Sequence, residues 1–518
     1  MMSGHNRRDF LADVGRGMLV ASVGSTAALE LGLSPALAGE TGKRLTFGKL
    51  EPLVSLMQET EPNKLLPLLV NELKSGSDLK TLTTAAALAN VRAFAGQDYI
   101  GFHTFMALIP AYQMASELSG KHSALPVLKV LYRNTSRIQD AGANNKDAMH
   151  RVTPVKSIDS THGGELVRES VRAVNWDQAE ARFAALANGP VGEAFNHLQY
   201  TVQDEVNVHR VVLSWRAWAM LPLAGEEYAH SLLRQSVRFC LKSEQNQVDN
   251  KRAPNPVRKV LPRLLDEYKL LAKPLGKTKP DDAWIEHLAD TIFSNTREQA
   301  AEAVAAALAE GMSAEAVGEA LSVAANKLLL HDPGRLEKYS SAAKPPGCVH
   351  GDSVGVHASD AANAWRAIAR VSNLRNQAAS LIVGAYHTAG QVRWSSKSPY
   401  PYAEQLDGIR ETSGKKLLAQ TEEAIKANDQ ARACAIVHRY GDLKLAHRPL
   451  FDLLLKYAVS QDGALHAEKY YRTASEEFAS ARPAFQWRQM VALARVTASE
   501  YGYPAPGYAE ARELLGVV

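Results

Sequence analysis

Histidine recurs in this 518-residue chain at a spacing typical of a repeated structural unit. Three histidines are each followed by a second one 19 or 21 residues later: His103 by His122, His209 by His230, and His447 by His466. A fourth unit begins at His357 and lacks the second histidine. Repetition of this kind constrains the architecture, because equivalent positions in stacked units tend to face a common axis.

An apolar, aromatic-bearing stretch follows each leading histidine, as in residues 105–112 and 450–457. Residues 297–311 and 313–330 are rich in Ala, Glu and Leu, and the break between them predicts a helical hairpin. Residues 177–180 have the Asp-x-x-Glu form of a capping box at a helix start. Alternating strand patterns are scarce. We therefore predict an all-α protein of repeated helical hairpins in two halves, arranged as an α-solenoid or a closed helical ring.

The N-terminus resembles a twin-arginine export signal. Arg7 and Arg8 are followed by a mildly apolar stretch and then by an Ala-x-Ala cleavage pattern that ends at Ala38. We expect residues 1–38 to be a signal peptide for the twin-arginine export machinery, which places the mature protein in the periplasm or outside the cell. This export route, as the resemblance implies, carries folded proteins and thus favours a bound cofactor. An amphipathic first helix of a cytoplasmic protein is the alternative interpretation.

The remaining chain divides into two histidine-bearing halves. Residues 39–250 and residues 283–518 each hold two units, and residues 251–282 form a Pro- and Lys-rich segment between them. We interpret that segment as a solvated connector, and a contact with an anionic surface is the alternative. No run of 18 apolar residues follows the signal, so no membrane span is expected after cleavage.

Composition excludes several classes of protein. The net charge of +4 and the lack of nucleic-acid-binding motifs argue against a nucleic-acid partner. The three cysteines have no Cys-x-x-Cys spacing, which excludes a disulfide scaffold, a zinc ribbon and a thioredoxin-type pair.

Helix length decides which histidines can share a site. A helix that begins at His103 is about 22 Å long at a rise of about 1.5 Å per residue, so His122 lies at its far end. The two members of a pair therefore cannot bind one metal ion. The leading histidines of different units lie at the same end of the stack and can converge. We expect His122, His230 and His466, at the turn end, to be structural or surface residues.

A second set of candidate ligands lies in the irregular segment from His331 to His357, which is rich in Gly and Pro. Imidazole and carboxylate groups suit zinc, copper or iron, and no spacing in this sequence selects among these metals. We predict a transition-metal ion as cofactor. The candidate ligands are His103, His209, His331, His350, Asp352, His357, His438 and His447.

Three further residues are candidates for catalysis. Arg366 follows His357 on the same expected helix and could orient an anionic or carbonyl group of a small-molecule substrate, and Tyr386 and His387 could transfer protons. Residues 351–355 match the Gly-x-Ser-x-Gly elbow of serine hydrolases, but no buried strand precedes them. A hydrolase is therefore a minor alternative.

The units of a histidine, an apolar helix, a short turn and a second helix resemble those of the questin oxidase-like proteins, with His103 and His357 as matching leading histidines. The resemblance implies a helical fold and oxygen-dependent opening of aromatic ketone rings. Together these features predict an exported metal-dependent enzyme, an oxidoreductase rather than a hydrolase. The alternative is a non-catalytic periplasmic helical-repeat scaffold that binds a protein or a polysaccharide.

Overall fold

The protein is all-α, as predicted, in the computed structural model, which describes residues 45–141, 148–400 and 402–517. Within these ranges the backbone forms helices and three isolated bridges but no strand. The predicted signal peptide, residues 1–38, lies outside the described residues. None of the helices in the described ranges has the length and apolar character that crossing a membrane requires.

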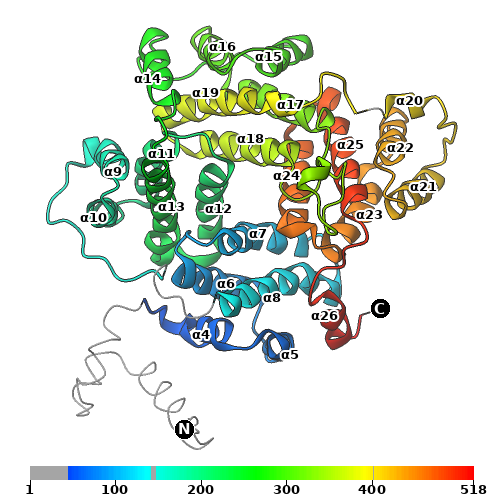
Figure 1. Ribbon diagram of the computed structural model, residues 1–518, viewed down its shortest axis with the longest axis horizontal. Helices are drawn as coiled ribbons and strands as arrows, with labels where there is room; N and C mark the ends of the chain where they lie inside the picture. The colour runs from blue at the N-terminus through cyan, green and yellow to red at the C-terminus, as the bar shows by residue number, and fades with distance from the viewer. Residues whose placement is uncertain (1–44, 142–147, 401, 518) are drawn as a thin grey trace, which may run out of the picture.

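The helices of the first half meet those of the second along α7 and α12 (Figure 1). Their bounds are α4 Glu51–Glu59, α5 Pro62–Lys74, α6 Leu79–Phe94, α7 Tyr99–Ala115, α8 Ala124–Asp140, α9 Gly163–Arg172, α10 Trp176–Leu186, α11 Val191–Val202, α12 Val208–Ala224, α13 Ala229–Asp249 and α14 Val257–Glu267. Those of the second half are α15 Asp282–Ser294, α16 Arg297–Ala309, α17 Ala314–Leu330, α18 Val354–Val371, α19 Leu374–Gln391, α20 Ala403–Leu406, α21 Gly414–Lys426, α22 Gln430–Asp442, α23 His447–Ser460, α24 Ala467–Ser480, α25 Pro483–Glu500 and α26 Tyr508–Leu515.

Short polar residues fix many helix starts. The side chains of Asp98, Asn207 and Ser353 accept hydrogen bonds from backbone N–H groups in the first turns of α7, α12 and α18. The two helices predicted in residues 297–330 are present as α16 and α17, but they pack mainly on other helices, α16 on α19 and α17 on α18. The capping residue of α10 is Asn175 rather than Asp177, because the Asn175 side chain accepts the Gln178 N–H at 3.1 Å.

Helices that are far apart in the sequence pack against one another. α7 of the first half packs on α24 of the second, and α12 packs on α18. In a linear solenoid each unit contacts only its neighbours, so these contacts do not confirm the repeated-hairpin arrangement. A single apolar core runs through both halves, with the large buried side chains of Phe105, Phe195 and Trp365 among its members.

Two segments between helices differ in kind. Residues 251–282 contain α14, which packs against α16 and α19, so this segment is partly helical rather than a plain connector. Residues 331–353 are mostly irregular, with one short 3-10 turn, Glu337–Tyr339. Backbone hydrogen bonds from Arg335 to Cys348 at 2.9 Å and from Gly347 to Arg335 at 2.8 Å close this segment into a loop that leads into α18.

The start of α18 depends on a glycine. A Cβ on Gly355 would lie 2.5 Å from the Cα of Leu329 on α17, so only glycine lets the two helices approach this closely. We predict that Gly355→Ala lowers the free energy of unfolding by about 1–3 kcal/mol through overpacking. Gly192→Ala on α11, where a Cβ meets nothing within 4 Å, is the control and is expected to be neutral or slightly stabilising. Urea denaturation of both variants measures this, and equal stabilities would contradict it.

Candidate metal centre

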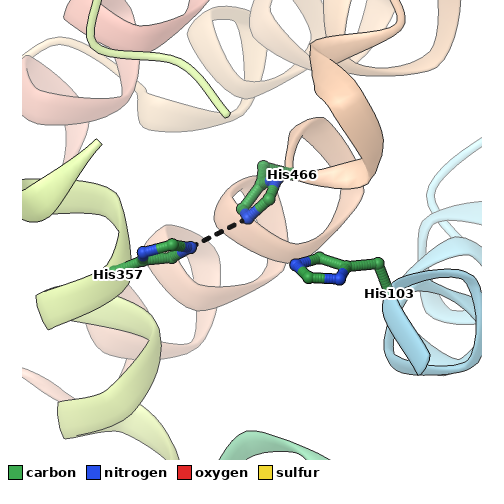
Figure 2. A group of neighbouring side chains, drawn as sticks. All are labelled: His103, His357 and His466. Atoms are coloured by element: carbon green, nitrogen blue, oxygen red, sulfur yellow. Dashed lines mark hydrogen bonds between the residues drawn. The ribbon is translucent and has the colours of Figure 1, made fainter. Parts of the chain in front are cut away.

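Four histidine side chains converge in the interior of the protein: His103, His209, His357 and His466. The Nε2 atoms of His103 and His209 are 3.1 Å apart, and those of His357 and His466 are 3.2 Å apart. The rings also neighbour one another across these pairs, with centroids 5.3 Å apart for His103 and His466 and 5.4 Å apart for His209 and His357. Figure 2 shows three of them, with the ring of His466 between those of His357 and His103.

Each of the four histidines stands at the start of a different helix. His103 is the fifth residue of α7, His209 the second of α12 and His357 the fourth of α18, and His466 directly precedes α24. Four helix N-termini therefore point toward one place, where α7 packs on α12 and α24, and α18 packs on α12 and α24. The partial positive charge of each N-terminus makes this a place that favours neutral or anionic groups over protonated imidazoles.

Backbone carbonyls orient two of the imidazoles. The Nδ1 of His103 lies 2.6 Å from the carbonyl oxygen of Tyr99, and the Nδ1 of His466 lies 2.9 Å from that of Ala464. A carbonyl can only accept, so each Nδ1 carries the proton and each Nε2 keeps a free lone pair. In metal sites a histidine is usually oriented in this way, by a hydrogen bond from the ring nitrogen that does not bind the metal.

The nitrogen spacings fit a metal ion. Ligand nitrogens at about 2.0–2.1 Å from a tetrahedral zinc ion lie about 3.3 Å from one another. The two Nε2 pairs, at 3.1 and 3.2 Å, are close to this edge length. The ligand nitrogens of His103, His357 and His466 all lie within 4.8 Å of one another. These three histidines are the most compact set of possible ligands, and His209, which is close to His103, would have to shift further to reach the same ion.

Burial keeps the four imidazoles neutral, which is the form that binds metals. Loss of hydration lowers the pKa of His209 to about 2 and that of His357 to about 3, with further lowering by neighbouring positive groups. The pKa values of His103 and His466 are also lowered well below the ordinary value for the same first reason.

Aromatic side chains line one side of the cluster. The ring of Phe102 stacks on His103 with centroids 4.9 Å apart, and the ring of Tyr99 lies 4.5 Å from that of His103. Phe102 is buried, but Tyr99 is 55% exposed, and His209 and His357 are half-buried. His209 and His357 are therefore nearer to solvent than His103 and His466, which are each 3% exposed.

A left-handed turn presents His466. Gly463, Ala464 and Leu465, directly before it, have φ values of 50°, 50° and 64°. Two of these residues are not glycine, and each costs about 1–2 kcal/mol in this conformation. Non-glycine residues with such backbone angles cluster at functional sites, where the surrounding structure holds them in place. The turn brings the His466 imidazole to the cluster from the start of α24.

The structure brings together three of the predicted metal ligands, His103, His209 and His357, and places the other five elsewhere. His350 is buried with both ring nitrogens occupied, at 2.9 Å from the Ser499 hydroxyl and 2.9 Å from the Ala343 carbonyl. His331 bonds to the Ser396 carbonyl. Exposed His447 packs on Phe478, and His438 pairs with Asp442.

Asp352 lies near the cluster without joining it. Its carboxylate pairs with Lys344 at 2.6 Å and also with Arg335, and these two cations lower the pKa of Asp352 to about 2 against the effect of burial. The negative charge of Asp352 raises the pKa values of His209 and His357 slightly against the larger effect of burial. The loop of residues 331–353 therefore contributes charge at the edge of the centre.

The predicted catalytic residues lie on α18 and α19 away from the four nitrogens. Arg366 is buried and pairs with Glu477 at 2.5 Å. The Nδ1 of His387 accepts a hydrogen bond from the Trp365 indole at 3.3 Å, and Tyr386 is buried beneath the guanidinium of Arg297. The hydroxyl of Ser353, in the Gly-x-Ser-x-Gly segment, caps α18.

The expectation that His466 lies apart from the leading histidines is wrong. His447 and His466 do stand at opposite ends of α23, but the site lies at the His466 end. The sequence signal that finds the site is a histidine at the start of a helix, and both residues satisfy it. Only the packing of α24 on α7 and α18 decides between them.

Comparison with known proteins gives no match: no protein-family model, no curated protein and no solved structure is similar to this chain.

Because the histidines of the cluster are neutral when folded, we predict that the free energy of unfolding of the metal-free protein depends on pH. Since the pKa of His357 falls from an ordinary 6.5 to about 3 in the folded state, unfolded chains bind more protons than folded ones between these values. The contribution of each neutral histidine to the free energy of unfolding is fully present above pH 6.5. It falls as the pH drops, by up to about 1.4 kcal/mol per pH unit for each buried histidine. Urea unfolding at pH 7.5 and 5.5 measures this fall.

The variant His357→Phe removes one of the four proton-linked groups, so its stability is expected to depend less on pH between 7.5 and 5.5. The variant His122→Gln, at an exposed histidine, is the control and is expected to keep the pH dependence of the unsubstituted protein. Equal pH dependence in His357→Phe and the control would show that the cluster does not carry the effect.

Proposed function

We propose that the protein is a metal-dependent oxidoreductase whose transition-metal ion is held by His103, His209, His357 and His466. The observation that carries this proposal is the convergence of four neutral imidazoles from four helices, with Nε2 pairs 3.1 and 3.2 Å apart. In the neutral state the Nε2–H groups of His209 and His357 can donate to the Nε2 lone pairs of His103 and His466. A metal ion would replace these two hydrogen bonds by bonds to the nitrogen lone pairs.

The donor set narrows the choice of ion. Four imidazole nitrogens without a carboxylate or a thiolate suit copper, iron or zinc and not magnesium or calcium, which prefer oxygen ligands. Copper and iron support redox chemistry, and zinc supports Lewis-acid chemistry. The sequence resemblance to the questin oxidase-like proteins favours oxidation, and the use of the Ser353 hydroxyl as a helix cap argues against the serine-hydrolase alternative.

A catalytic role is favoured over a structural one by the unequal burial of the ligands. Structural sites use four protein ligands in a closed tetrahedron, whereas catalytic sites keep one position for a water molecule or substrate, so catalysis requires that one of the four histidines leave the ion or that a fifth position be open. Here His209 and His357 are half-buried, and the exposed ring of Tyr99 lies 5.6 Å from that of His209. A small-molecule substrate would approach from this side, with the aromatic rings of Tyr99 and Phe102 as its wall. Export by the twin-arginine machinery to the periplasm or the exterior is part of the same proposal.

Metal analysis tests the centre. Purified protein is expected to contain about one copper, iron or zinc ion per chain, and His357→Ala and His466→Ala are each expected to lower this content at least tenfold. His447→Ala and His350→Ala are the controls and should keep the metal, because the first side chain is exposed and the second has both nitrogens bonded to protein. A folded, metal-free wild-type protein would instead support the non-catalytic scaffold.

Redox spectroscopy tests the assignment to oxidation. If the ion is copper or iron, the absorbance or electron paramagnetic resonance spectrum should change on reduction with dithionite and recover in air. The variant His466→Gln should lose this signal, whereas His447→Gln should keep it. Zinc as the bound metal would refute the redox assignment and leave Lewis-acid chemistry.

A further inference from the structure

The interface of α18 and α24 carries polar contacts that continue from the histidine cluster. The Thr473 hydroxyl donates to Asp360 at 2.8 Å, and the Asn363 amide donates to Glu477 at 2.9 Å. These residues lie three or four positions apart on each helix and so form one stripe. All four are at most 4% exposed. A charged stripe at this depth is unusual in an all-α core and calls for a physical reason.

Lys469 is the residue of this stripe nearest to the cluster in sequence. It follows His466 by three residues, about 4.5 Å along the helix axis. Its side chain is in the interior, because the residue is only 2% exposed. Within the described ranges its ammonium makes no direct hydrogen bond or ion pair, and the charges of Asp360 and Glu468 only partly offset the burial that lowers the pKa of Lys469 to about 8. Its positive charge acts in the same direction as burial and lowers the pKa of each of the four histidines.

Arg216 brings a second positive charge to the same region. It lies on α12, two turns after His209, and is 2% exposed. The Nε of its guanidinium has no hydrogen-bond partner. Asp360 interacts electrostatically with both Arg216 and Lys469, and one carboxylate cannot neutralise two cations.

The other carboxylates of α24 are already paired with cations of their own. The ion pairs are Glu468 with Lys129 at 2.6 Å, Glu476 with Arg472 at 2.8 Å, and Glu477 with Arg366 at 2.5 Å. The region between the cluster and Arg216 therefore has an excess of positive charge, to which the four helix N-termini add. A bound metal cation would increase this excess further. Burying uncompensated charge costs several kcal/mol per ion.

We infer that Lys469 and Arg216 form a binding site for a small oxyanion, a carboxylate or an inorganic anion, beside the four-histidine cluster. This inference rests on the proposed metal centre in assigning the anion to the substrate or to a ligand of the ion. The anion would receive the unpaired hydrogen bonds of the ammonium and the guanidinium and offset their charge. The substrate class of the proposed oxidoreductase is thus an anion or a molecule with one carboxylate.

A surface pocket of about 300 Å³ lies at the far end of the same interface. Trp215 of α12, Asn363 of α18 and Arg472 of α24 line it, and each follows the cluster histidine of its helix by six residues. This spacing corresponds to about 9 Å along each helix. Arg216 interacts with Arg472 and Glu476 of the pocket wall as well as with Asp360. Neither Lys469 nor Arg216 lines this pocket, but Arg216 directly follows Trp215 of its wall, and Lys469 lies three residues before Arg472.

Calorimetric titration with sodium acetate and with sodium phosphate, at pH 7 and constant ionic strength, tests the inference. Wild-type protein should bind at least one of the two, and the stronger ligand identifies a carboxylate or a phosphate-like anion. Lys469→Met removes a charge-assisted hydrogen bond and is expected to weaken binding about tenfold. Asp360→Asn removes the competing carboxylate and is expected to tighten it. The control Lys456→Met, at an exposed lysine, should change nothing.

The outcomes distinguish failure of the anion site from failure of the metal centre. Failure of wild-type protein to bind either anion, or equal affinity in Lys469→Met, overturns the inference. If Lys469→Met does not fold, unchanged or weaker binding in Asp360→Asn does so instead. Metal content measured on the same samples shows whether the centre itself is present. Anion binding that depends on Lys469 in metal-free protein would refute the metal centre and keep the anion site.

Discussion

The burial of four neutral imidazoles at the meeting point of four helix N-termini is the constraint on which the rest of the structure depends. Each helix must begin at the right place, and the capping side chains of Asp98, Asn207 and Ser353 set three of these starts. The positive ends of the helices and the loss of hydration act in the same direction, because both disfavour protonation of the rings. The rings are therefore held in the neutral form, and a cation added beside them would require anionic charge nearby.

Close packing of small residues makes the convergence possible. α17, α18 and α19 are rich in alanine and pack against one another. Glycines allow the nearest approaches, since a Cβ on Gly384 of α19 would lie 2.7 Å from the Leu321 side chain of α17. Contacts between the two halves of the chain then bring α7 to α24 and α12 to α18. The site is thus made by the whole fold and by no single segment of it.

The sequence predicts the helical class well, because helix caps and apolar periodicity are local properties. It also predicts that histidines at helix starts can converge, as His103, His209 and His357 do. It cannot choose His466 over His447, because both stand at helix starts and the choice depends on contacts between residues more than 100 positions apart. His350 shows a second limit: its neighbourhood is rich in possible ligands, yet Ser499, about 150 residues away, occupies one of its nitrogens.

The left-handed turn at Gly463–Leu465 bears on how long an ion would stay on the protein. Three of the four histidines lie within the first turns of packed helices, but His466 depends on two residues in a costly backbone conformation. The backbone N–H of Asp462 donates a hydrogen bond to the carbonyl of Tyr503 at 2.8 Å, which connects this turn to the chain after α25. Relaxation of the turn would release one ligand while the other three stay in place. The rate of metal exchange would then depend on how often this turn relaxes. Binding of the ion would also be coupled to the folding of the C-terminal helices.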